Sequence, residues 1–368
     1  MSELYTASRL RVWRQCARAH LYKYVLAIRT PSTHPMEFGT HTHAALEAWY
    51  RAWQADEPRL EAALVAIDSL ETTDVDRVRL RVLVAAYDAR WGAAEWEVLA
   101  VEVQFRYFLG DIEIGGKIDA LIREIATGRV FVVEHKTSTA DTSPGAPYWE
   151  RLAIDTQVSI YIDGAAAGLD YEVAGCIYDV IKRPLHEPLL ATPIESRRFT
   201  QGRGCPKCGG SAKAGEVQQG RGFYTVKFPG EPDKNIDCDG CAATGWKLNK
   251  EGGPEAPRLH SNQRDRDESI DEYQTRLAAE VAERIDEYLA RAEVYRLDDE
   301  LPLRRQEVID TIESMRALDE KHLAPANHDA CIRGRDTCAF FAACTGRADI
   351  NDEFTFPRGT AHSELAAA

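Results

Sequence analysis

The sequence predicts an α/β fold in which a helical segment precedes three strands, a helix and a further strand, with helical additions and a cysteine-rich insertion. Two observations lead to this prediction. The apolar residues change from helical spacing to alternation near residue 95, and they return to helical spacing near residue 148. Four cysteines in two CxxC pairs then occur between residues 205 and 241, in a stretch rich in Gly, Lys and Arg.

Helical spacing comes first, over residues 5–27 and again from about residue 40 to residue 91. Three strands rich in Val, Ile and Phe follow, at 95–110, 111–125 and 130–137. The turn between the last two is "ATGR". Because these strands are close together in the sequence, an antiparallel meander is their simplest arrangement.

The second half of the core repeats the helix-then-strand order, with a helix at 148–169 and a strand at 171–183. Two strongly charged helices are expected later, at 267–296 and 303–322. The predicted domains are a core at 1–199, an inserted cysteine module with its linker at 200–262, and C-terminal helices with a cysteine-containing tail at 263–368 that complete the core domain.

Composition limits the classes of function. The 368 residues have a net charge of −14, which argues against a generally basic DNA-coating protein. It does not exclude a nuclease, because metal ions can supply positive charge. No run of about 18 apolar residues occurs, so no membrane contact is expected. The N-terminal residues lack the apolar segment of a signal peptide, so we expect a cytoplasmic protein.

Two acids and a lysine interrupt the apolar strands at Asp119, Glu134 and Lys136. Alternation places Glu134 and Lys136 on one face of a strand, and antiparallel pairing brings Asp119 beside them. Two unit charges about 4 Å apart repel by roughly 4 kcal/mol at an effective dielectric near 20, so a fold keeps them only with a compensating cation. Oxygen ligands suit Mg²⁺ or Mn²⁺. The alternative is a surface salt bridge of Lys136 with one acid.

The wider context resembles the PD-(D/E)XK nuclease superfamily and, within it, the RecB-like branch that includes AddB-type and CRISPR-adaptation exonucleases. Four segments carry the resemblance, and they occur in the family's order: "GTHTHAALE", "GKID", "EHKT" and "QVSIY". The resemblance implies a restriction-endonuclease-like core. One departure is Ala17, since a proline commonly follows the first cysteine in that family.

The resemblance also implies roles for individual residues. Asp119, Glu134, His43 and the backbone carbonyl of His135 would bind the Mg²⁺ or Mn²⁺ ion. Lys136 would assist hydrolysis, and Gln157 and Tyr161, which share a helix face at i,i+4 spacing, would position the nucleic acid strand. His41 has the poorer motif position. Glu102 either supports the site indirectly or faces outward from its strand.

The two CxxC pairs supply four thiolates, enough for a tetrahedral zinc site in a zinc-ribbon-like insertion. Their members are Cys205, Cys208, Cys238 and Cys241. A module this small can hardly bury a core of its own, so metal binding would provide its folding energy. The alternative is four unligated thiols. The module could contact either nucleic acid phosphates or a protein.

A second set has one early and three late cysteines, namely Cys16, Cys331, Cys338 and Cys344. RecB-like nucleases often join the two ends of the domain through a 4Fe-4S cluster with this order of ligands. The gap between Cys331 and Cys338 is wider than usual in the family. Zinc and unligated thiols are the alternatives. Cys176 lies within an apolar strand and is expected to be a buried thiol.

Together with the resemblance, these observations favour a divalent-metal-dependent DNA nuclease, with an exonuclease acting on single strands or DNA ends favoured over an endonuclease, in recombination, repair or phage DNA processing. The alternative is a non-catalytic nucleic-acid-binding or recombination-assembly protein that uses the zinc module. A zinc-ribbon adaptor for protein partners is a third hypothesis. The chain has no Walker-type phosphate loop, so a helicase or recombination protein would have to be a separate partner.

Overall fold

The computed structural model describes residues 3–213, 216–227, 232–321, 323–333, 336–362 and 365. The chain forms two compact units. The first joins Met1–His186 to Gln274–Ala368, and the second is Glu187–Tyr273. The insertion expected at 200–262 lies inside the second unit. Among the described helices, none combines the length and apolar character that crossing a bilayer requires.

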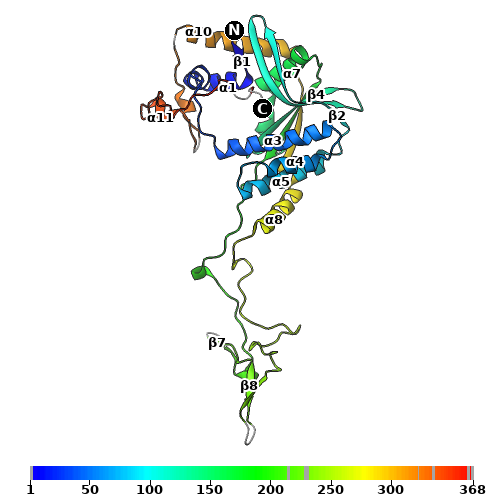
Figure 1. Ribbon diagram of the computed structural model, residues 1–368, viewed down its shortest axis with the longest axis vertical. Coiled ribbons are helices and arrows are strands. Elements are labelled where there is room, and N and C mark those ends of the chain that lie inside the picture. Colours follow the sequence, from blue (N-terminus) through cyan, green and yellow to red (C-terminus); the bar gives the residue numbers. More distant parts are fainter. Residues whose placement is uncertain are drawn as a thin grey trace. The chain divides into compact units, whose positions relative to one another are not determined.

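A mixed sheet forms the centre of the first unit (Figure 1). The predicted meander is present as antiparallel strands β2 (Trp96–Leu109), β3 (Ile112–Glu124) and β4 (Val130–Ser138). The predicted fourth strand, β5 (Gly175–Lys182), pairs in parallel with β4. Two further strands complete the sheet: β10 (Leu289–Val294), antiparallel to β5, and the short β1 (Leu4–Tyr5), parallel to β3.

The turns of the meander are set by two glycines. Gly110, between β2 and β3, has a φ of +63°, and Gly128, between β3 and β4, has a φ of +71°. Residues with a Cβ rarely adopt these angles, and glycine adopts them without steric cost. The two tight turns hold the strands in antiparallel register, and this register decides which strand residues lie beside one another.

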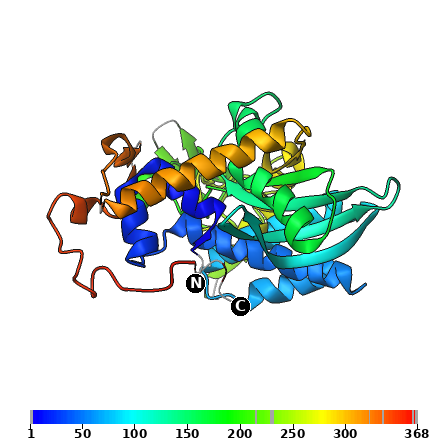
Figure 2. The ribbon, with the colours of Figure 1, turned by 90° about the horizontal axis from the view of Figure 1, so that it is seen from above.

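Two groups of helices cover the sheet (Figure 2). On one face, α3 (His34–Gln54) packs on β2, β3 and β4, and α4 (Arg59–Asp68) and α5 (Asp74–Trp91) pack on α3. On the other, α7 (Thr156–Leu169) packs on the sheet and contacts α1 (Ala7–Gln15) and α10 (Glu300–Glu320). Alternation along β4 decides which side chains meet which helices, because odd-numbered residues face α3 and α5 and even-numbered ones face α7.

Close packing of α7 on the sheet depends on one aromatic ring between two glycines. A Cβ at Gly116 of β3 would lie 2.5 Å from Phe105, and one at Gly164 of α7 would lie 2.3 Å from the same ring. Phe105 is 2% exposed and packs edge-on against Tyr161, with ring centroids 5.7 Å apart. Larger residues at either glycine would push α7 away from β3.

Three expectations for the helices need correction. The helix expected at 267–296 ends early, because α8 (Ile270–Glu283) and α9 (Ile285–Tyr288) are followed by strand β10. Pairing with the free edge of β5 outweighs the helical pattern there. The helix at 148–169 is divided into α6 (Pro147–Glu150), a 3₁₀ turn (Arg151–Ile154) and α7.

The N-terminal helix is likewise divided, into α1, α2 (Ala17–His20) and a π turn (Leu21–Val25). The helix expected at 303–322 is α10, and residue 322 lies outside the described residues. The remaining short elements are 3₁₀ turns (Ile194–Ser196, Pro206–Cys208, His328–Ala330), strands β6 (Ser211–Lys213), β7 (Glu216–Gln218), β8 (Phe223–Val226), β9 (Lys234–Asp237), β11 (Ile332–Arg333) and β12 (Asp336–Thr337), and α11 (Phe341–Cys344).

Candidate active site

The acids lie where β3 and β4 separate. The last paired residues of the two strands are Ala120 and Val133, and Asp119 and Glu134 are their neighbours just outside the paired region. The next backbone donor, the N–H of His135, bonds instead to the Asp119 Oδ2 at 2.8 Å. Asp119 is 9% and Glu134 2% exposed, so both carboxyl groups are removed from most of the solvent. The strand geometry thus concentrates negative charge in a buried position.

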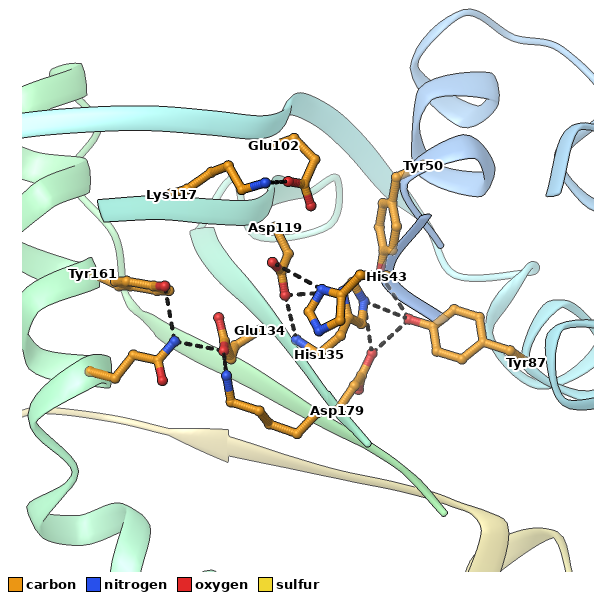
Figure 3. Close-up of polar contacts among 12 residues, drawn as sticks. His43, Tyr50, Tyr87, Glu102, Lys117, Asp119, Glu134, His135, Tyr161 and Asp179 are labelled. Carbon is orange, nitrogen blue, oxygen red and sulfur yellow. Dashed lines mark hydrogen bonds and ion pairs between the residues drawn. The ribbon is translucent and has the colours of Figure 1, made fainter. Parts of the chain in front are cut away.

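Helix α3 supplies a histidine to this point. The Nδ1 of His43 is 3.5 Å from the Asp119 Oδ1 (Figure 3). Burial alone raises the pKa of Asp119, but the charge on His43 and hydrogen bonds from His135 and His43 outweigh burial and hold this pKa well below 3.8. His41 lines a separate pocket with His34 and Asp76. The structure therefore brings His43, and not His41, to the acids.

Glu134 lies at the centre of a second set of contacts (Figure 3). Its Oε1 forms an ion pair with Lys136 and accepts a 2.7 Å hydrogen bond from the Gln157 Nε2. The same amide donates to the Tyr161 hydroxyl at 2.9 Å. The Glu134 Oε2 is buried and has no hydrogen-bond partner among the described residues. A buried carboxylate oxygen without a partner is costly and indicates a missing cation or donor.

Charge coupling fixes the protonation state of Lys136. Burial alone lowers the pKa of the Lys136 ammonium. The charges on Glu134 and Asp119 raise it by more, so the net pKa lies above its ordinary value of 10.5. Burial raises the pKa of Glu134, and Asp119 adds to this effect while Lys136 opposes it. Lys136 is therefore protonated at neutral pH, so it can donate a hydrogen bond or stabilise negative charge but cannot accept a proton.

Glu102 lies beside the candidate site. The sequence alone did not decide between this position and one facing outward from the strand. One carboxylate oxygen of Glu102, one ring nitrogen of His43 and one oxygen of Asp119 all lie within 4.8 Å of one another. Glu102 also forms an ion pair with Lys117. Its φ of +50° is uncommon for a residue with a Cβ, and such strain is concentrated at functional sites. The side chain thus lies beside the metal-binding candidates and does not project into solvent.

A buried polar network behind the site was missed by the sequence analysis. Asp179 of β5 accepts hydrogen bonds from Arg291 of β10 at 2.5 and 2.8 Å and from the Tyr87 hydroxyl at 2.6 Å. The His135 ring lies between two carboxylates, with Nδ1 3.4 Å from Asp119 and Nε2 3.7 Å from Asp179. An acid in the apolar run "GCIYDVIK" was the available signal for Asp179. Arg291 gave none, because its strand was not foreseen.

The donor set fits a divalent ion with a preference for oxygen. The ligand atoms that lie within 4.8 Å of one another come from His43, Glu102 and Asp119, and Glu134 lies outside this group. Glu134 offers its Oε2, which has no hydrogen-bond partner among the described residues. Hard ions such as Mg²⁺ and Mn²⁺ prefer carboxylate and carbonyl oxygens. Acids, a histidine and a protonated lysine from α3, β2, β3 and β4 thus lie near one another, and carboxylate oxygens are the donors that hard divalent ions prefer.

Comparison with known proteins agrees with this class. The family model described as the PD-(D/E)XK nuclease superfamily matches residues 5–345. The chain therefore belongs to the PD-(D/E)XK nuclease superfamily, whose members are metal-dependent nucleases. Among curated proteins no relative matches the sequence. A solved structure titled "Crystal structure of SSO0001" is 20% identical, with a TM-score of 0.19, over 39% of this chain and 60% of that chain.

The four cysteines of the second unit form a compact cluster, and all four sulfur atoms lie within 4.8 Å of one another. The Sγ–Sγ distances are 3.8 Å for Cys205–Cys238 and 3.8 Å for Cys208–Cys241. Metal–sulfur bonds of about 2.3 Å in a tetrahedron place sulfur atoms about 3.8 Å apart. The backbone N–H groups of Gly222 and Gly245 point at two of the sulfurs. The cluster fits a zinc-ribbon-like insertion.

The other cysteine set also comes together in space. Cys16, Cys331, Cys338 and Cys344 line one small pocket between the N-terminal helices and the tail. The backbone N–H of Asn327 donates to the Cys16 Sγ at 3.4 Å, and the N–H of Cys338 donates to the Cys331 carbonyl at 2.8 Å. Unlike the sulfur atoms of the second unit's cluster, the four sulfur atoms of this set do not all lie within 4.8 Å of one another.

Proposed function

We propose that this protein is a divalent-metal-dependent DNA exonuclease that acts on single strands or DNA ends. The observation that carries this proposal is the pairing of Asp119 on β3 with His43 on α3, next to the Glu134–Lys136 pair on β4. One oxygen of Glu134 is buried and has no hydrogen-bond partner among the described residues. Membership of the nuclease superfamily supports the chemistry. The preference for DNA ends rests on the resemblance of its motifs to RecB-like exonucleases.

In this proposal Asp119, Glu134, His43 and the His135 carbonyl hold Mg²⁺ or Mn²⁺. When bound, such an ion would supply Lewis-acid chemistry, polarising the phosphodiester and making a nearby water more acidic. Lys136 orients that water or stabilises the charge that develops on the phosphate oxygens, which its protonated state permits. Gln157 donates hydrogen bonds to both Glu134 and Tyr161 through one amide group. In this proposal Gln157 and Tyr161 position the nucleic acid strand next to the acids.

The two cysteine sets complete the proposal. The cluster of the second unit holds one structural zinc ion, since its sulfur spacing equals the edge of a zinc tetrahedron. The set at the chain ends holds a 4Fe-4S cluster; this is supported by the four cysteines that share one pocket and by their order of one early and three late residues, which resembles that of RecB-like nucleases. A separate helicase or recombination protein would deliver the DNA.

The experiment is a cleavage assay on labelled single- and double-stranded DNA with Mg²⁺, Mn²⁺ or a chelator. We expect metal-dependent release of nucleotides from DNA ends. Asp119→Ala, Glu134→Ala and Lys136→Ala should each lower activity by several orders of magnitude, because removing one member of a catalytic unit costs nearly as much activity as removing all of them. Near-normal turnover of the Glu134 variant would contradict the mechanism. DNA binding without any cleavage would favour the non-catalytic alternative.

A further inference from the structure

A polar pocket of about 540 Å³ adjoins the acids in the first unit. Helix α1, the end of β4, the 3₁₀ turn after α6 and the first turn of α7 surround it. Lys136 and Gln157 line both this pocket and the candidate active site. The pocket therefore shares two side chains with the candidate active site and lies next to it.

Three arginines line the pocket, and none of them forms an ion pair with a carboxylate among the described residues. Arg11 has neither a hydrogen bond nor an ion pair there, and it lines the same pocket as Lys136. Arg14 donates to two hydroxyl groups, the Thr156 Oγ1 at 2.6 Å and the Thr311 Oγ1 at 3.0 Å. Neither guanidinium group forms an ion pair with a carboxylate among the described residues, although Glu307 and Asp155 act on Arg14 at longer range.

The third arginine is held in place by uncharged partners. Arg151 donates to the Tyr148 carbonyl at 3.1 Å and lies 3.4 Å from the Tyr178 hydroxyl. Its guanidinium group also stacks on the Tyr148 ring, 4.1 Å from the centroid. These contacts restrict the side chain without neutralising it, so less freedom is lost when it binds an anion.

The acids near the pocket are already engaged. Asp155 is the one acid in the lining, and its Oδ1 caps α7 by accepting from the backbone N–H groups of Gln157 and Val158. Glu307, which acts on Arg14 at longer range, bonds to Arg304 at 2.8 Å. In a chain with a net charge of −14, this pocket is a local excess of positive charge.

We propose that this pocket, which we call the arginine groove, binds the backbone phosphates of one DNA strand immediately beside the scissile phosphate. The proposal rests on the proposed nuclease function and assigns Arg11, Arg14 and Arg151 to phosphate contacts. Guanidinium groups without a carboxylate partner match phosphate oxygens in charge and geometry. Its volume falls within the range of roughly 300–1,000 Å³ for small-ligand pockets, which suits a short stretch of one strand and not a duplex.

The test measures binding of a fluorescent single-stranded oligodeoxythymidylate by anisotropy, at several salt concentrations and without added Mg²⁺ or Mn²⁺. A plot of log K against log salt has a negative slope, and each lost phosphate contact makes it about 0.7 less steep for single strands. We expect the slope to become less steep by about 0.7 in Arg11→Ala and by about 2 in the triple alanine variant. We also expect roughly tenfold weaker binding per arginine. Arg11→Lys should restore most of the slope.

The matched control is Arg123→Ala. Arg123 is a half-exposed arginine of β3 that pairs with Glu97 at 2.6 Å, four residues beyond Asp119 in the strand. It should leave binding and slope unchanged. Unfolding temperatures of all variants verify the fold, and Arg11→Ala is the cleanest variant because Arg11 has no partner to lose among the described residues.

The outcomes separate this proposal from the proposed function. An unchanged slope and affinity in the folded triple variant would overturn the arginine groove, even if the wild-type protein cleaves DNA. An equal loss in Arg123→Ala would also overturn it, because binding would then follow general surface charge. A slope that falls as expected, in a protein that cleaves no DNA with either ion, would support the groove and refute the nuclease proposal.

Discussion

Replacement of Arg291 by methionine should destabilise the protein strongly, although the residue belongs to no motif. The Arg291 side chain forms two hydrogen bonds with Asp179, which is 2% exposed. It also lies over the rings of Trp91 and Trp96, at 3.8 and 4.7 Å from their centroids. Methionine keeps most of the length and apolar contact but leaves the Asp179 carboxylate buried without its counter-ion.

The expected loss follows from this geometry. Breaking a buried ion pair by removing one partner costs about 3–5 kcal/mol, and the lost cation–π contacts add about 0.5–2 kcal/mol. Whole domains are stable by only about 5–15 kcal/mol, so the variant loses a large part of its stability. The Tyr87 hydroxyl and the His135 ring remain as partners of Asp179, so the loss in free energy of unfolding should lie toward the lower end of this range.

The sign of the pH dependence is also fixed. In the wild type, burial raises the pKa of Asp179, but Arg291, His135 and Tyr87 outweigh burial, so the net pKa lies below 3.8. This carboxylate therefore contributes stability above pH 3.8 that is lost as the pH falls. Without Arg291 burial dominates and the pKa rises above the unfolded value. The difference between variant and wild type should then be largest at pH 7 and shrink toward pH 4.

Urea denaturation followed by circular dichroism measures these differences. The double variant Arg291→Met/Asp179→Leu should be more stable than Arg291→Met alone, since it removes the uncompensated charge. Arg51→Met, which breaks an exposed i,i+4 pair with Glu47, should cost only about 0.5 kcal/mol. A loss below about 1 kcal/mol in Arg291→Met at pH 7, or a double variant less stable than the single one, would refute the reasoning.

Three further predictions concern the metal centres and a buried histidine. The variant Cys238→Ser/Cys241→Ser should lose one zinc ion per chain in elemental analysis, and unchanged zinc content would contradict the assignment. Anaerobically purified protein should be brown, with broad absorbance near about 400 nm. Cys344→Ser should lose this colour, whereas Cys176→Ser, which alters a buried thiol of β5, should keep it; colourless wild-type protein without iron would exclude the cluster. Burial and Arg9 lower the pKa of His20 to about 4 from 6.5, and its Nε2 accepts a hydrogen bond from Arg9 at 3.0 Å. His20 thus contributes stability above pH 6.5 that is lost as the pH falls toward 4, on the order of 3 kcal/mol. In urea titrations His20→Gln should lack this part of the pH dependence, and an identical pH profile would contradict it.

The fold was predictable where the local pattern and the tertiary structure agree. The meander at 95–137 has clear alternation and short turns, so its three strands are confirmed. Strand β10 was not predictable, because "LARAEV" continues a charged helical pattern and becomes a strand only by pairing with the edge of β5. Such pairing depends on a partner more than 100 residues away, about which local periodicity carries no information.

The candidate site divides in the same way. Asp119, Glu134, Lys136, Gln157 and Tyr161 could be named from the sequence because each lies in a short motif that resembles a motif of the nuclease superfamily. The network behind them could not, since its members come from α3, α5, β5 and β10 and meet only after the sheet forms. Glu102 was visible as an acid in an apolar strand, but only its position beside His43 distinguishes a site residue from an outward-facing one.

The place of β10 in the chain has a consequence for synthesis on the ribosome. All the proposed catalytic residues have been made by Tyr161, but the counter-ion of Asp179 follows 112 residues after that acid. At about 5–20 residues per second, this interval is roughly 6–22 s. During this time the nascent core must hold a buried charge without its partner, so the core cannot become fully stable. Chains arrested before residue 291 should therefore be less stable than the full-length chain, and full activity would be reached only late in synthesis.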